Sequence, residues 1–312
     1  MQPQHSPVFW PGGPVRLALG RRQYDLATRA LVIGILNRTK DSFYDRGSYF
    51  NLDRFFERAE QLVREGADVL DVGGVKAGPG PEVTEEEELD RVVPVIASLH
   101  ERFDVPVSVD TWRARVAAAA FEAGAVLGND ISGFADPGYL PAAASAGASV
   151  VATHIRLAPR VPDPDPHYED LVVEVESFLL TRAERALSFG IPADRVVLDA
   201  GLDLGKTADQ SLLLLQCSAR LASLGYPLLL SSSNKTFLGV RLGLELGQRR
   251  EASLASAALG IAGGCRLVRV HDVTGTCKVR DVLAAILESA PKRASGGPEQ
   301  AAVSPVGGTR SR

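Results

Sequence analysis

The chain has 312 residues, of which 45% are hydrophobic, 23% are charged and only 6% are aromatic. This balance is typical of a folded globular protein with a large core, and it excludes a disordered or fibrous chain. The net charge of −4 supplies no global positive field that would attract nucleic acid or acidic membranes. We therefore expect no nucleic-acid partner and no membrane partner.

Three cysteines, Cys217, Cys265 and Cys277, lack CxxC spacing, which argues against a disulfide framework and against a zinc site. The N-terminus lacks a basic region followed by an apolar stretch, and no run of about 18 apolar residues occurs. These observations predict a protein of the reducing cytoplasm.

Both ends of the chain are rich in Gly, Pro or Ser. We expect residues 1–14 to form a flexible N-terminus and residues 291–312 to form a disordered tail. The folded part is then a single domain over residues 15–290. Within it, residues 15–28 contain two short apolar pieces around Gly20 and predict a hairpin before the first long apolar run.

Eight short apolar runs then alternate with longer segments of helical periodicity. The runs are rich in Val, Ile or Leu and lack strict alternation, which is typical of strands buried on both faces. The predicted strands are Leu31–Leu36, Ala67–Val72, Val105–Val109, Ala125–Leu127, Ala148–Ala152, Arg195–Leu198, Pro227–Leu230 and Arg266–Val270.

The first two intervening segments show how the helices are predicted. Residues 52–63 carry an apolar stripe at helical spacing, with Asn51 as the expected N-cap. Thr84 and Glu87 have the spacing of a capping box, so the next helix is predicted to begin there. The acidic run at 85–88 then lies in its first turn, where the helix dipole favours negative charge.

An open doubly wound sheet and a closed barrel both alternate strands with helices. Eight repeats over about 260 residues match the (β/α)8 TIM barrel in number and size. We therefore predict a single α/β domain with the (β/α)8 fold. The hairpin expected at residues 15–28 would close the bottom of this barrel.

In such barrels the active site lies at the carboxyl ends of the strands. Every predicted strand here ends in a hydrogen-bonding or ionisable side chain, and eight convergent polar ends exceed what helix capping alone would explain. These residues are Asn37, Asp71, Asp110, Asn129, Asp130, His154, Asp199, Ser232, Ser233, Lys235, Arg269 and His271. The pattern predicts a polar pocket.

The residue types in this pocket indicate a ligand class. Carboxylates and amides pair with the donors and acceptors of a nitrogen heterocycle, while Lys235, Arg269 and His271 could hold an anion such as phosphate. We expect a flat polar ring that carries a phosphate tail. No residue cluster has the spacing of an all-protein metal site, but Asn37 could share Mg²⁺ with substrate phosphates.

Two segments resemble nucleotide-binding motifs without matching them. Residues 201–207, GLDLGKT, have three residues between the glycines where the phosphate loop requires four. Gly239, Gly243 and Gly247 lie in a predicted loop-to-helix segment rather than in GxGxxG spacing after a strand. No GxSxG motif is present, so covalent acyl chemistry has little support.

Six segments carry, in chain order, the motifs of one known family. They are GILNRTKDSFYDRG at 34–47, GADVLDVGG at 66–74, SVDT at 108–111, GAVLGNDISG at 124–133, DAGLDLGKT at 199–207 and LVRVHDV at 267–273. They resemble the successive signatures of dihydropteroate synthase. The resemblance implies a homodimeric (β/α)8 barrel that condenses a dihydropterin methyl pyrophosphate with p-aminobenzoate in folate synthesis.

The resemblance also implies residue roles. The pterin positions are Asp110, Asn129, Asp199 and Lys235, the pyrophosphate positions are Arg269 and His271, and the magnesium-linked position is Asn37. Asp41 lies on the first loop, where the family has an Asp close to the reacting centre. The implied mechanism is loss of Mg-bound pyrophosphate and attack of the arylamine on a cationic pterin methylene, with Asp41, Asp110 and Lys235 as catalytic residues.

The departures from the family fall mainly on one side of the site. After DVGG the family reads ESTRPG, whereas residues 75–80 read VKAGPG, so its Thr and Arg are absent. Lys40 replaces the Pro of the TPD motif, and Asn234 replaces the Arg of the SRK motif. The DPGxGFGK motif has become DAGLDLGK at residues 199–206, with its Pro and one aromatic replaced.

These losses affect the parts that the family uses to hold p-aminobenzoate, while the pterin and pyrophosphate positions largely remain. Because a misplaced amine forfeits the advantage of proximity, we expect a divergent paralogue with little or no synthase activity, for which p-aminobenzoate is a doubtful ligand. One alternative is an active synthase in which Lys76 or Lys40 replaces the missing cation. Another is a pterin-dependent methyltransferase, which would require a corrinoid or similar partner.

Overall fold

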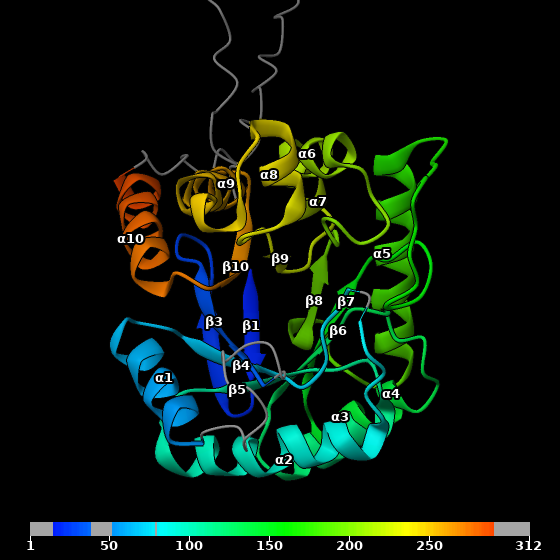
Figure 1. The fold of residues 1–312 in the computed structure, drawn as a ribbon, viewed down its shortest axis with the longest axis vertical. Coiled ribbons are helices and arrows are strands. Elements are labelled where there is room, and N and C mark those ends of the chain that lie inside the picture. The colour runs from blue at the N-terminus through cyan, green and yellow to red at the C-terminus, as the bar shows by residue number, and fades with distance from the viewer. Residues whose placement is uncertain (1–14, 39–51, 79, 290–312) are drawn as a thin grey trace, which may run out of the picture.

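A computed structural model describes residues 15–38, 52–78 and 80–289. Eight parallel strands close into a barrel in the order β10-β3-β4-β5-β6-β7-β8-β9 (Figure 1). They are β3 (Leu31–Asn37), β4 (Val69–Gly73), β5 (Val107–Asp110), β6 (Leu127–Asp130), β7 (Ser149–Thr153), β8 (Val196–Asp199), β9 (Leu228–Leu230) and β10 (Cys265–Val270). The (β/α)8 fold is confirmed, and each predicted strand overlaps an observed one, although the predicted Ala125–Leu127 shares only Leu127 with β6.

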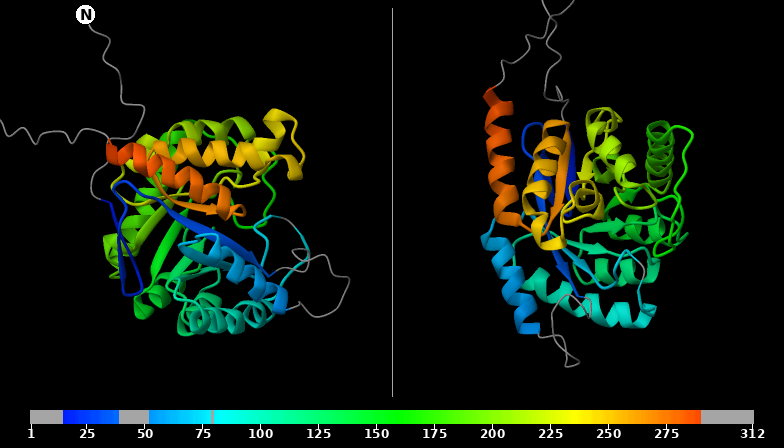
Figure 2. Two further views of the ribbon diagram at one scale, coloured as in Figure 1. Left: turned by 90° about the vertical axis from the view of Figure 1, so that its left-hand side faces the viewer. Right: turned by 45° about the horizontal axis from the view of Figure 1, so that its top comes forward.

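Helices surround the barrel and cover the outer faces of its strands (Figures 1 and 2). They are α1 (Leu52–Arg64), α2 (Glu85–Arg102), α3 (Ala114–Glu122), α4 (Tyr139–Ala146), α5 (Leu171–Ser188), α6 (Ala208–Gln216), α7 (Ser218–Ala222), α8 (Thr236–Leu242), α9 (Arg250–Ala262) and α10 (Val273–Ser289), with 3-10 turns η1 (Ala193–Arg195) and η2 (Leu246–Gln248). The main core lies between the two layers, where Val92 and Ile96 of α2 pack in one cluster with Leu70 of β4. Among the described residues, no helix combines the length and apolar character needed to cross a membrane.

Two helices begin with the same local motif. At α2, the side chain of Thr84 accepts the N–H of Glu87, and the side chain of Glu87 accepts the N–H of Thr84, as predicted. Thr207 and Gln210 form a second capping box at α6. The threonine of the GLDLGKT segment therefore caps a helix, which explains that segment without a nucleotide. Asn51, the expected N-cap of α1, lies outside the described residues.

The predicted hairpin consists of β1 (Arg16–Leu19) and β2 (Arg22–Asp25), paired antiparallel. Leu17 and Leu19 pack against inward-facing apolar side chains of the barrel strands, such as Ile33 of β3. In the left panel of Figure 2 the hairpin lies at the end of the barrel where β3 begins. The hairpin thus closes the bottom of the barrel, and polar side chains gather at the other end.

Candidate functional site

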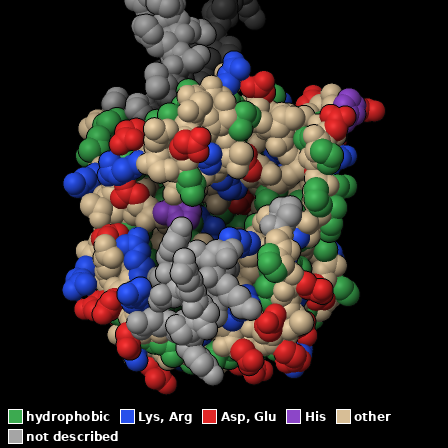
Figure 3. All heavy atoms as spheres, in the orientation of Figure 1, with side chains coloured by type: hydrophobic (Ala, Val, Ile, Leu, Met, Phe, Trp, Pro, Cys, Tyr) green, Lys and Arg blue, Asp and Glu red, His purple; other side chains and the backbone are tan. Residues whose placement is uncertain are grey.

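Five of the predicted binding residues, each from a different part of the barrel, line one cavity of about 450 Å³. They are Asp110 on β5, Asn129 on β6, Asp199 on β8, Lys235 just before α8 and Arg269 on β10. The cavity lies at the carboxyl ends of the strands, where barrels of this kind carry their active sites. In Figure 3 basic and acidic side chains surround a hollow near the middle of the visible face.

Arg269, one of the residues that line this cavity, pairs with two carboxylates. Its Nε donates to Asp71 Oδ2 at 2.6 Å, and its Nη2 donates to Asp110 Oδ2 at 2.7 Å. Burial raises the pKa of Asp110 to about 7, because it outweighs the opposing charge of Arg269. Burial alone would lower the pKa of Arg269, but the carboxylates raise it well above its ordinary value. An incoming ring that donates to Asp110 must therefore share that carboxylate with a permanent cation.

Lys235 and Asp199 add an opposite pair of charges. Lys235 Nζ donates to the carbonyl oxygen of Leu202 at 2.6 Å, and Asp199 Oδ1 accepts the N–H of Gly201 at 2.8 Å. Burial lowers the pKa of Lys235 and raises that of Asp199, while the charge of each opposes the shift of the other. Gly201 has a φ of +64°, and a Cβ here would lie 1.9 Å from the carbonyl oxygen of His154. Only glycine permits this close approach of the two loops.

Two buried polar atoms of cavity-lining residues have no hydrogen-bond partner among the described residues. They are Asn129 Oδ1 and Thr153 Oγ1. Buried polar groups are nearly always hydrogen-bonded, and leaving one unpaired costs about 1–3 kcal/mol. A ligand with ring N–H donors would supply the missing partner of Asn129, so this part of the cavity suits a polar heterocycle.

Asn37 and His271 are not among the residues that line the cavity. Asn37 ends β3, and its Oδ1 lies 3.3 Å from the position that a Cβ on Gly73 would take. His271 follows β10 on the surface, and its Nδ1 shares a hydrogen bond with Ser233 Oγ at 3.0 Å. Asp41 lies outside the described residues. The roles of these three residues stay predictions.

Other polar residues at strand ends serve the fold. Asp130 is buried and accepts the N–H of Phe134 at 2.9 Å, which shapes the turn after β6. Lys206 is buried, donates to the carbonyl oxygen of Gly201 at 2.8 Å, and lies 2.8 Å from His154 Nδ1. Burial lowers the pKa of Lys206 to about 7 and, together with the Lys206 charge, lowers that of His154 to about 3. Lys206 thereby joins the loops after β7 and β8.

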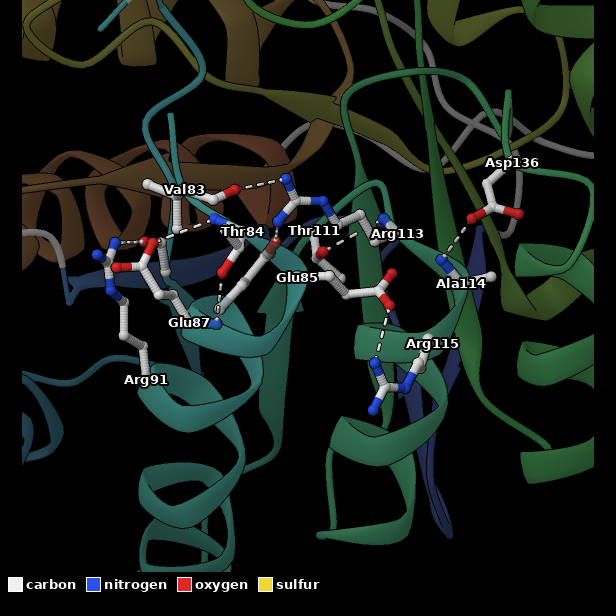
Figure 4. Close-up of polar contacts among 12 residues, drawn as sticks. Val83, Thr84, Glu85, Glu87, Arg91, Thr111, Arg113, Ala114, Arg115 and Asp136 are labelled. Carbon is white, nitrogen blue, oxygen red and sulfur yellow. Dashed lines mark hydrogen bonds and ion pairs between the residues drawn. The ribbon is translucent and has the colours of Figure 1, made fainter. Parts of the chain in front are cut away.

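Two arginines hold the ends of the loop between β4 and α2. Arg91 donates to the carbonyl oxygen of Gly74 at 2.9 Å, and Arg113 donates to that of Val83 at 2.7 Å. Figure 4 shows Arg113 reaching from the start of α3 to Val83. Arg113 also pairs at 2.6 Å with Glu88, whose side chain is 0% exposed. Burial raises the pKa of Glu88, so this carboxylate depends on its arginine.

Sequence reasoning missed several residues that line the cavity, and two of them join neighbouring loops. Arg160, between β7 and α5, donates to the carbonyl oxygens of Gly80 and Pro81 at 2.5 and 2.6 Å, and so joins two loops. Asp203, between β8 and α6, accepts the N–H of Thr236 at the start of α8. Nothing in the sequence marks Arg160. Asp203 could have been found, because it stands at a glycine of the DPGxGFGK pattern.

The residues present fit a magnesium ion that arrives with a phosphate ligand. Among the described residues, no group of three or more His, Cys, Asp or Glu could hold a metal alone. However, Asn37 Oδ1 and Asp110 Oδ2 both lie near Gly73, 3.3 and 3.6 Å from the position that a Cβ there would take. Amide and carboxylate oxygens are ligands that Mg²⁺ accepts when phosphates and waters supply the rest.

Comparisons with known proteins agree with this geometry. A family model described as pterin binding enzyme matches residues 33–271. The chain is 44% identical to a Mycobacterium leprae protein named inactive dihydropteroate synthase 2, over 85% of this chain and 93% of that protein. It is 38% identical to the dihydropteroate synthase of Synechocystis sp., with 86% and 96% of the two chains covered. A crystal structure of Xanthomonas albilineans dihydropteroate synthase with 4-aminobenzoic acid matches with a TM-score of 0.82 at 38% identity, covering 89% of this chain and 100% of that one.

Proposed function

Since this chain belongs to the pterin-binding enzyme family that includes the dihydropteroate synthases, we propose that it binds a pterin phosphate in the barrel cavity and has little or no synthase activity. Similar relatives include proteins named dihydropteroate synthase and proteins named inactive dihydropteroate synthase 2. Whether this chain is an active or an inactive synthase depends on which of the family's cavity residues it retains.

The observation that carries the proposal is the set of strand-borne polar residues that we call the inner end of the cavity: Asp110, Asn129, Asp199 and Arg269. Along its edge a pterin ring presents N–H donors beside ring acceptors. The donors suit two carboxylates and an amide oxygen, and the ammonium of Lys235 suits a ring acceptor. The unpartnered Oδ1 of Asn129 supports this assignment, because a ring donor would remove the cost of leaving it unpaired.

A pyrophosphate tail would extend from the ring toward Arg269 and His271. Arg269 is already a fixed cation, and its planar guanidinium can donate to phosphate oxygens as well as to carboxylates. Asn37, with substrate oxygens, would hold Mg²⁺. When bound, that ion would stabilise the negative charge on a departing pyrophosphate. A catalytic role for Asp41 follows from the resemblance alone.

The loops around the mouth, which we call the outer end of the cavity, lack groups that the family uses to position p-aminobenzoate. Ala77 and Gly78 replace the family's Thr and Arg and line the cavity without a polar side chain. Asn234 replaces another Arg. An amine that is not held in line with the pterin methylene loses the rate advantage of orientation, so turnover falls much more than pterin binding.

Two measurements test the proposal. Calorimetric titration with 6-hydroxymethylpterin should show binding that an Asp110→Ala variant loses. Pyrophosphate release from dihydropterin methyl pyrophosphate with Mg²⁺ should stay at the uncatalysed rate with and without p-aminobenzoate. Arylamine-dependent release that disappears in Asp110→Ala would instead establish an active synthase. Absence of pterin binding to the wild-type protein would overturn the proposal as a whole.

We also infer that the chain forms a homodimer and works in the cytoplasm. The dimer follows from the family resemblance, and the exposed apolar side chains of Val240 and Leu246 support self-association. Cys217, Cys265 and Cys277 are free thiols, which supports a reducing compartment. Light scattering of the protein as it elutes from a size-exclusion column tests the dimer, because the mass of a monomer would contradict it.

A further inference from the structure

Asp203 places a fixed carboxylate in the wall of the cavity. Its Oδ2 accepts the N–H of Thr236 at 2.6 Å, and its Oδ1 accepts the N–H of Phe237 at 3.2 Å. Its own N–H donates to Ser211 Oγ at 3.1 Å. These bonds connect the loop after β8 to the first turn of α8 and to α6. The negative charge of Asp203 is therefore held at a defined place in the outer end of the cavity.

The backbone of Asp203 has an uncommon conformation. Its φ is +66°, in the left-handed region that favours glycine and that Asp and Asn enter more readily than other residues with a Cβ. Glycine would adopt this conformation without strain, and the DPGxGFGK pattern has glycine here. This chain instead keeps a carboxylate at the position, and the bonds to α8 offset the strain.

The cations that line the cavity are already engaged by the protein. Lys206 donates to backbone carbonyls, and Lys235 donates to the carbonyl oxygen of Leu202. Arg160 donates to two carbonyls, and Arg269 donates to two carboxylates. A ligand carboxylate placed near Asp203 would face a like charge, and each of these cations would have to exchange a hydrogen bond to the protein for one to the ligand. In a partly buried site such repulsion is weakly screened.

The surfaces around Asp203 suit an aromatic ring. Apolar side chains form much of the cavity wall, namely Ile131, Ile155, Leu157, Val161, Leu202 and Leu204. An uncharged aromatic amine would place its ring against these side chains, and a neutral N–H group on it could donate to a carboxylate.

We propose that Asp203 is a specificity-determining residue that makes the outer end of the cavity accept uncharged aromatic amines and reject those that bear a carboxylate. This inference rests on the proposed function, because it takes the second ligand to bind beside the pterin. It also gives a physical reason, beyond the missing Thr and Arg, why p-aminobenzoate is a poor ligand. Asp203 acts here through its charge and not through any contact with the reacting atoms.

The test uses two isosteric probes, p-aminobenzoate and p-aminobenzamide, which differ in charge. Each is titrated calorimetrically into protein saturated with 6-hydroxymethylpterin, which has no leaving group. Wild-type protein should bind the amide at least tenfold more tightly than the carboxylate. Asp203→Asn should shift this ratio at least tenfold toward the carboxylate, because Asn tolerates the left-handed backbone and removes the charge.

Two further variants complete the test. Asp203→Gly, which relieves the backbone strain, should shift the ratio in the same direction. Asp209→Asn makes the same charge change at a side chain that is 78% exposed on α6, and it should leave the ratio unchanged. Equal binding of both probes to the wild type, binding of neither probe to any variant, or an unchanged ratio in both Asp203 variants would overturn the inference. The preceding titration with the pterin alone decides the proposed function separately.

Discussion

The inner and outer ends of the cavity have diverged to different degrees. The inner end is built from side chains on β5, β6, β8 and β10, at positions where the family resemblance predicts the pterin and pyrophosphate contacts. The outer end is built from loops, where Ala77 and Gly78 replace polar residues and Asp203 replaces a glycine. Barrel strands fix the direction of each side chain through their hydrogen-bonded register, whereas loops change sequence without disturbing the barrel. A ligand-binding function can therefore survive the loss of the chemistry beside it.

The largest effect that we expect concerns the attachment of the outer loop to the barrel. Arg113→Ala leaves the carboxylate of Glu88 buried without its cation and removes the donor to Val83 (Figure 4). Breaking a buried ion pair from one side costs about 3 kcal/mol, and we expect a loss of this size in the free energy of unfolding. Urea denaturation measures it.

The neighbouring Arg115→Ala variant is the matched control. Arg115 pairs with Glu85 and Glu86, and all three side chains are well exposed. Exposed pairs contribute little to stability, so its denaturation midpoint should stay close to that of the wild type. If the two arginine variants were equally stable, the loop would not depend on the buried pair.

The second prediction concerns the inner end. Asp110→Asn keeps the shape of the side chain but removes a charged acceptor and one partner of Arg269. We expect the affinity for 6-hydroxymethylpterin to fall by about 2 kcal/mol, or roughly 30-fold. Calorimetry measures it, with Asp209→Asn as a control of unchanged affinity. An Asp110→Asn protein with wild-type affinity would show that the ring does not bind at the inner end.

The third prediction is a pH dependence of the same binding. The pKa of Asp110 is raised to about 7, so this carboxyl gains a proton as the pH falls through that value. A protonated carboxyl is a poorer acceptor for a ring N–H, and affinity should fall by up to about tenfold per pH unit below 7 and level off above it. In Asp110→Asn this part of the pH dependence should disappear, because an amide does not titrate. Any pH dependence that comes from the probe's own titration is common to both proteins and should remain. Parallel curves would contradict the assignment to Asp110.

The sequence predicts the inner end well and the outer end poorly, for a physical reason. Asp110, Asn129 and Asp199 are found by the rule that strand ends converge in a closed barrel. The same rule includes Asp130 and His154, whose side chains satisfy nearby backbone or lysine groups instead of lining the cavity. Strand position alone does not tell whether a polar side chain lines the cavity or bonds to a neighbouring group of the fold.

Contacts between loops have no comparable rule. Arg160 reaches the carbonyls of Gly80 and Pro81 only because two loops, about 80 residues apart in the chain, meet at the mouth of the barrel. Nothing local in the sequence encodes that meeting. Asp203 differs from Arg160, because a carboxylate at a glycine position of the family pattern is a signal in the local sequence. Nothing in the sequence around Thr236 marks it as the partner of Asp203. A family pattern thus shows where a loop has changed, but it does not predict the contacts that the changed loop makes.

The smallest effect that we expect comes from restoring part of the outer end with Ala77→Thr and Gly78→Arg together. Gly78 lines the cavity, and a Cβ there meets nothing within 4 Å, so a side chain can begin at this position without a clash. Arylamine-dependent pyrophosphate release should become measurable but stay within about tenfold of the background, because Asn234 and Asp203 still differ from the family. Adding Asp203→Gly to this pair should raise the rate further. A return to ordinary turnover with the pair alone would mean that those two positions account for the lost activity, whereas no gain even in the triple variant would show that residues 77, 78 and 203 do not limit turnover.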